Sequence, residues 1–117
     1  MVNSIYTKFS IEGFHQWKDV PKHSSEDYLQ HRHRHMFYFK CSVEALDDDR
    51  EIEFIALRRK IKGFIINNFG IPAEFKGMSC EMIGKLVIDY LQSLYGDKRR
   101  YNVDVSEDNE SGAVVNG

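Results

Sequence analysis

The sequence has little cysteine, little proline and no long apolar run. Its two cysteines, Cys41 and Cys80, are too few for a disulfide framework, and neither belongs to a CxxC pair. No stretch approaches the ~20 apolar residues of a membrane-spanning helix, and the first residues lack the basic-then-apolar order of a secretory signal. We therefore expect a cytoplasmic protein with free thiols and no membrane association.

The chain also lacks an excess of charge of either sign. It has 16 Lys and Arg residues against 18 Asp and Glu residues, a formal net charge of -2, which supplies no general attraction for a phosphate backbone. We therefore expect no nucleic-acid partner. The 117 residues, 42% of them hydrophobic, suffice for one core. We expect a single domain over residues 1–117, with 109–117 as a partly frayed tail.

The spacing of apolar residues changes from a period of two to a helical period and back again. Alternation indicates half-buried strands, and the i, i+3, i+4 spacing indicates amphipathic helices, the second of them capped by Ser79 and ended by Gly96. This order, ββααββ, predicts an α+β fold: a four-stranded antiparallel sheet with two helices on one face. The predicted elements are strands over 5–14, 36–46, 101–105 and 113–115, helices over 54–68 and 80–95, and a turn at Asp108-Asn109.

Three histidines alternate along the segment that leads into the second predicted strand. His31, His33 and His35 share the parity of the buried positions that follow them, and His15 ends the first strand on its buried parity. Antiparallel pairing of the two strands would bring His15 beside His33 and His35. Three imidazoles with an open fourth position are typical of a catalytic zinc site. The alternative is a solvated strand end, rich in histidine and arginine, that binds an anion or nothing.

Several segments follow one another in an order that resembles a known enzyme family. The segments are Phe9–His15 (F-x-x-x-x-x-H), His33-Arg34-His35 (H-G-H in the family), Leu46-Asp47 with Ile52-Glu53-Phe54, Ser79-Cys80-Glu81 (T-x-E in the family) and Val103–Glu107. The resemblance covers the chain from about Phe9 to Val115. This set is similar to the 6-pyruvoyltetrahydropterin synthase and 6-carboxytetrahydropterin synthase family.

The resemblance implies the tunnelling fold, in which the sheets of several subunits, usually six, join into a homo-oligomeric barrel with pterin sites at the subunit interfaces. It implies a zinc-dependent lyase of queuosine or tetrahydrobiopterin biosynthesis that acts on 7,8-dihydroneopterin triphosphate or a similar pterin. The zinc ligands would be His15, His33 and His35. Glu107 would pair with the N–H edge of a pterin or purine, and Ser79 would lie in the substrate site. Without the resemblance, the sequence favours an acidic turn residue at Glu107.

Two proton-transfer groups of that family have no counterpart here. The loop from Ser25 to Arg32 contains no cysteine, and residues 68–70 contain neither Asp nor His. The general base is therefore unassigned. Cys80, whose thiol pKa a helix N-terminus would lower, and His31 or His23 in the long loop are weak candidates. The simpler interpretation is a structural thiol and exposed imidazoles.

These departures leave two other functions open. The chain is then either a catalytically silent relative that serves as a pterin- or purine-binding or assembly module, or an unrelated α+β domain with a histidine-rich strand.

Overall fold

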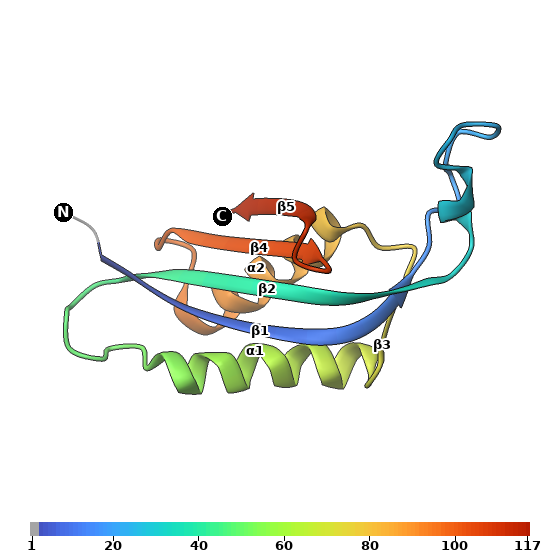
Figure 1. Ribbon diagram of the computed structural model, residues 1–117. Coiled ribbons are helices and arrows are strands. Elements are labelled where there is room, and N and C mark those ends of the chain that lie inside the picture. Colours follow the sequence, from blue (N-terminus) through green and yellow to red (C-terminus); the bar gives the residue numbers. More distant parts are fainter. Residues whose placement is uncertain (1–2) are drawn as a thin grey trace.

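Five strands form one sheet, and two helices pack against one of its faces in the computed structural model, which describes residues 3–117 (Figure 1). The sheet order is β3-β1-β2-β4-β5. The predicted α+β fold is confirmed. The elements are β1 (Asn3–His15), a 3-10 turn η1 (Asp27–Gln30), β2 (His33–Ala45), α1 (Phe54–Phe69), β3 (Ala73–Lys76), α2 (Cys80–Tyr95), β4 (Tyr101–Glu107) and β5 (Ser111–Asn116).

The prediction of a four-stranded antiparallel sheet was wrong, because β3 adds a fifth strand and pairs with β1 in parallel. The order of elements is therefore ββαβαββ. Four residues directly after Pro72 are too few to show a reliable alternation, so this strand gave no sequence signal. Its side chains Ala73 and Phe75 are nonetheless buried, and Phe75 packs against Phe37.

The C-terminal hairpin is longer than predicted. β5 runs from Ser111 to Asn116, and Gly117 exchanges two backbone hydrogen bonds with Tyr101. Residues that we expected to form a partly frayed tail are thus paired in the structure. The turn at Asp108-Asn109 is confirmed: both residues have positive φ, 56° and 59°, which Asp and Asn tolerate better than most residues.

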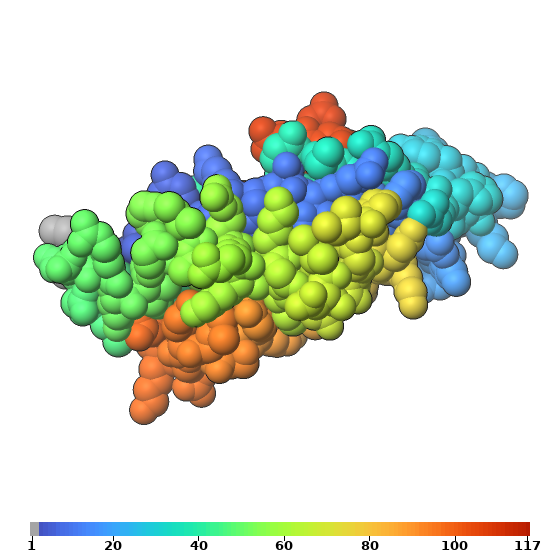
Figure 2. All heavy atoms as spheres, turned by 90° about the horizontal axis from the view of Figure 1, so that it is seen from below, coloured from blue at the N-terminus to red at the C-terminus, as the bar shows by residue number. Residues whose placement is uncertain are grey.

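The core lies between the helices and the odd-numbered side chains of the central strands. These side chains face one side because the register of β1, β2 and β4 aligns odd residues with odd residues. Phe37, Val43 and Val103 are fully buried there, as are Leu57 and Leu91 of the two helices. Figure 2 shows this covered side, with α1 in green and α2 in orange lying next to one another.

Both helices begin with a side-chain cap and end at a glycine. Glu53 accepts hydrogen bonds from the first N–H groups of α1, and Ser79 accepts one from Met82 N–H at 3.2 Å, so the predicted cap of α2 is confirmed. Gly70 and Gly96 follow the helices with φ of 87° and 94°. Within residues 3–117, neither helix is long and apolar enough to cross a membrane.

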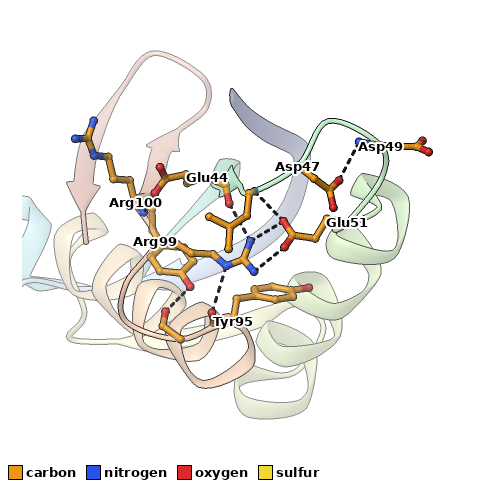
Figure 3. Close-up of polar contacts among 10 residues, drawn as sticks. Glu44, Asp47, Asp49, Glu51, Tyr95, Arg99 and Arg100 are labelled. Atoms are coloured by element: carbon orange, nitrogen blue, oxygen red, sulfur yellow. Dashed lines mark hydrogen bonds and ion pairs between the residues drawn. The ribbon is translucent and has the colours of Figure 1, made fainter. Parts of the chain in front are cut away.

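An ion pair closes the end of the molecule where β1 begins and β2 ends (Figure 3). Arg99 Nη1 and Nη2 donate to the two carboxylate oxygens of Glu51, at 2.8 and 3.0 Å. The same guanidinium donates to the carbonyls of Glu44 and Tyr95, and Glu51 also accepts from Leu46 N–H. Arg99 therefore ties the loop before α1 to the loop before β4.

We expect this contact to make stability depend on pH. Arg99 and Leu46 N–H lower the pKa of Glu51 from 4.5 to about 2. A carboxyl with a lower pKa in the folded chain stabilises it fully above pH 4.5, and this contribution disappears as pH falls through 2. Glu51→Gln should therefore lower the thermal unfolding midpoint at pH 7. The difference in midpoint between variant and wild type should shrink as pH falls from 4.5 to 2. Thermal melts across this range test it, with Asp48→Asn in the same loop as the charge control. A deficit independent of pH would contradict the assignment.

Candidate metal centre

The sequence predicts that His15 lies beside His33 and His35, and the structure brings these three residues together at the end of β1 and the start of β2. His15 lies directly opposite His33 in the antiparallel register, and His35 lies two residues further along β2 on the same face. The ring centroids are 4.6 Å apart for His15 and His33, 5.5 Å for His15 and His35, and 5.0 Å for His33 and His35. The pairing of two strands thus gathers residues separated by 18 to 20 positions.

Aromatic side chains form the floor of this cluster. The Phe37 ring packs edge-on against His15 and His35, with centroids 5.2 and 5.9 Å away, and Phe75 packs behind Phe37. Gly13, which pairs with His35, leaves room for them: a Cβ there would lie 2.9 Å from both phenylalanine rings. The imidazoles therefore stand on a packed apolar base, which limits their movement.

Each imidazole uses its Nδ1 atom for a contact outside the cluster. A backbone carbonyl can only accept a hydrogen bond, so the proton of a neutral His15 or His33 lies on Nδ1, and Nε2 keeps a lone pair. A carboxylate has the same effect on His35. The three contacts join His15 Nδ1 to Met78 O at 3.0 Å, His33 Nδ1 to His31 O at 2.8 Å and His35 Nδ1 to Asp108 Oδ2 at 2.8 Å.

Glu107 completes a group of four donors. Pairing of Phe37 with Glu107 brings its carboxylate to the histidines, and Oε2 lies 2.6 Å from His15 Nε2 and 3.5 Å from His35 Nε2. Both contacts are ion pairs when the imidazole is protonated. The Nε2 atoms of His15 and His35 are buried and have no hydrogen-bond partner among residues 3–117.

Buried nitrogen atoms without partners are costly unless something else binds them. One ligand atom from each of His15, His33, His35 and Glu107 lies within 4.8 Å of all the others. Tetrahedral zinc with bonds of about 2.1 Å places its ligands roughly 3.4 Å apart, so modest side-chain adjustment would suffice. The group can hold a metal ion.

The electrostatics of the cluster couple His15 to Glu107. Burial lowers the pKa of His15, but the contacts with Glu107 and the Met78 carbonyl outweigh burial, so the pKa is raised above 6.5. The pKa of Glu107 is lowered by its contact with His15, against the opposing effect of burial. A bound cation would take the place of the imidazole proton and would stabilise the same carboxylate.

A pocket of about 490 Å³ opens beside the histidines, a size within the range of small-molecule sites. Its lining combines charged and polar residues with apolar ones. Ser79, expected in the substrate site, does line this pocket, although its hydroxyl also caps α2. The lining includes His15, His33, Glu107, Trp17, Leu29 and Met82.

None of the three weak candidates for a general base belongs to the group of four donors. Cys80 lines the pocket, but it is 8% exposed, and burial together with Glu107 raises the pKa of its thiol to about 12. The expectation that the N-terminus of α2 would lower this pKa was wrong, because burial dominates. His31 gives its backbone carbonyl to His33, and its exposed side chain lies outside the donor group. His23 is an exposed loop residue.

Asp108 contacts the cluster, which the sequence did not predict. The sequence predicts only a turn at Asp108-Asn109, whereas the structure places the Asp108 carboxylate on His35. The register supplies the missing signal: pairing of Phe37 with Glu107 puts the next residue, Asp108, beside Met36 and His35.

Neither a scan against protein-family models nor a search of curated proteins gave a match for this chain. The interpretation of the site therefore rests on its own residues and geometry.

We expect Cys80 to be inert in the folded protein. With a pKa of about 12, roughly one thiol in ten thousand is ionised at pH 8, and the thiolate is the reactive form. Iodoacetamide at pH 8 should therefore label Cys80 and the buried Cys41 far more slowly in the native protein than in urea, as followed by mass spectrometry. Rapid labelling of native Cys80 would show an activated thiol and would reopen its assignment as a catalytic base.

Proposed function

We propose that the protein is a zinc-dependent tetrahydropterin synthase-like lyase that binds 7,8-dihydroneopterin triphosphate or a similar pterin beside the histidine cluster. The observation that carries this proposal is the convergence of one ligand atom from each of His15, His33, His35 and Glu107 beside a pocket of suitable size. The order of motifs along the chain supports the same family. The proposed fold is the tunnelling fold.

In this proposal His15, His33 and His35 hold the metal, and their outer contacts keep Nε2 available. Bound zinc supplies a Lewis acid that lowers the pKa of a coordinated hydroxyl. Zinc is favoured over magnesium or calcium because the donors are mainly imidazole nitrogens, whereas those two ions prefer oxygen.

Glu107 orients the substrate in the proposed complex. A carboxylate accepts two parallel N–H bonds, which is the pattern that the aminopyrimidinone edge of a pterin offers. The lowered pKa of Glu107 keeps this group ionised and therefore an acceptor at neutral pH. Its contact with His15 in the ligand-free chain would give way to the substrate.

A second candidate is a pterin- or purine-binding module without catalysis. The residues that line the pocket favour this candidate. Among the residues that the structure describes, the thiol in this pocket is that of Cys80, and its pKa of about 12 keeps it protonated at neutral pH. The loop before β2 contributes Leu29, which cannot transfer a proton. Removal of a proton from carbon requires a base. Turnover of 7,8-dihydroneopterin triphosphate by the zinc-loaded protein separates the two candidates.

We further propose a homo-oligomer, of which a hexamer is the form that the resemblance implies. The face of the sheet away from the helices carries exposed Tyr6, Tyr38 and Val114, and β3 and β5 leave edges without a partner strand among residues 3–117. Such edges are usually covered or paired with neighbouring subunits.

The metal proposal makes a direct prediction about composition. The purified protein should contain close to one zinc ion per chain, and His33→Ala combined with His35→Ala should abolish its retention, because a single imidazole with one carboxylate cannot hold the ion against water. Elemental analysis by mass spectrometry after dialysis measures this, and His23→Ala in the exposed loop is the matched control. Unchanged zinc in the double variant would overturn the ligand assignment.

A separate prediction concerns the substrate pocket. Glu107→Gln should weaken binding of neopterin by about 1.5–3 kcal/mol, or roughly 10- to 150-fold, because the charge-assisted pair of hydrogen bonds is lost. Zinc should remain, because three imidazoles are retained. Fluorescence titration of the zinc-loaded proteins measures the affinity, and Glu110→Gln in the same turn controls for charge. Equal affinity in the Glu107 variant and the wild type would remove Glu107 from the site.

A further inference from the structure

Asp108 holds one imidazole of the cluster from outside the group of four donors. Its Oδ2 atom lies 2.8 Å from His35 Nδ1, and its Oδ1 atom accepts a hydrogen bond of 2.9 Å from Met36 N–H. Its own N–H donates to Met36 O at 2.7 Å. Asp108 therefore docks the turn after β4 onto the start of β2, and both of its carboxylate oxygens act as acceptors.

The three imidazoles differ in what fixes them. His15 and His33 direct Nδ1 to backbone carbonyls, which remain whatever side chains are present. His35 directs Nδ1 to a side chain. Because a carboxylate can only accept, Asp108 requires the proton of a neutral His35 on Nδ1 and leaves the lone pair on Nε2, which is buried and faces the other donors.

We propose that Asp108 is a positioning residue of the metal site, which fixes the tautomer and ring orientation of His35 so that Nε2 is available to the ion. This inference rests on the proposed function, because it concerns the same site. Outer carboxylate partners of metal-bound histidines commonly strengthen metal binding in this way. The role is additional to those of the four donors.

Asp108→Asn tests this role selectively. The carboxamide has one acceptor oxygen and one donor nitrogen, whereas the two neighbours, Met36 N–H and the metal-competent His35 Nδ1–H, are both donors. In either orientation of the amide, one donor faces another when the metal is bound. Without metal the conflict disappears, because His35 can move its proton to Nε2 and accept at Nδ1.

The same substitution spares the turn. Asp108 has a φ of 56°, and asparagine adopts this left-handed conformation readily. The Oδ1 acceptor for Met36 N–H is also retained in one amide orientation. A role limited to the fold of the hairpin would therefore leave metal binding unchanged in this variant.

Zinc affinity is the first measurement, made by competition with a fluorescent chelator. We expect Asp108→Asn to bind zinc roughly 10- to 100-fold more weakly than the wild type. Glu110→Gln, which removes the same charge from the same exposed turn, should change the affinity less than twofold. Equal affinities for wild type and Asp108→Asn would overturn the inference while leaving the metal site intact. Wild-type protein that binds no zinc would overturn both.

The second measurement reads the tautomer without metal or activity. Nitrogen-15 NMR of the imidazoles in the metal-free protein should show neutral His35 protonated at Nδ1 in the wild type and at Nε2 in Asp108→Asn, while His33 stays protonated at Nδ1 in both. The wild-type spectrum alone tests whether neutral His35 is protonated at Nδ1. The measurement is therefore informative even if the variant is less stable. A wild-type His35 protonated at Nε2 would overturn the inference.

Discussion

The pairing of β1 with β2 is the constraint on which the rest of the structure depends. Thirteen residues of each strand, from Asn3 to His15 and from Ala45 back to His33, pair in one continuous antiparallel register. A shift of one residue would turn every buried side chain of one strand to the open face. The same shift would separate His15 from His33. The burial of the core therefore also determines the geometry of the histidine cluster.

The cluster has a second layer that holds it in shape. The apolar floor beneath the rings restricts their rotation, and the Nδ1 contacts determine where each proton lies. These contacts come from three separate places in the chain: the segment before α2, the loop before β2 and the turn after β4. The site thus depends on the whole hairpin and helix arrangement, although its donors lie on only three strands.

Much of this arrangement could be predicted from periodicity, and the failures have physical causes. The long strands and both helices bury enough alternating or helical apolar positions to be recognised, and the antiparallel pairing was sufficient to bring the histidines together. β3 was missed because four residues carry too little pattern, and its place is determined by packing of Phe75 in the core. The Cys80 thiol was misjudged because burial depends on tertiary packing, and Asp108 because its partner lies 73 residues away.

X-ray absorption at the zinc K-edge of the zinc-loaded protein tests the central claim most directly, because it reports the atoms bound to the ion. The structure predicts nitrogen and oxygen neighbours at about 2.0–2.1 Å, with the outer-shell scattering of three imidazoles and no sulfur. Cys80 is the thiol that lines the adjacent pocket, and its high pKa argues against its being a ligand. A sulfur neighbour near 2.3 Å, or a shell of six oxygens without imidazole scattering, would contradict the account.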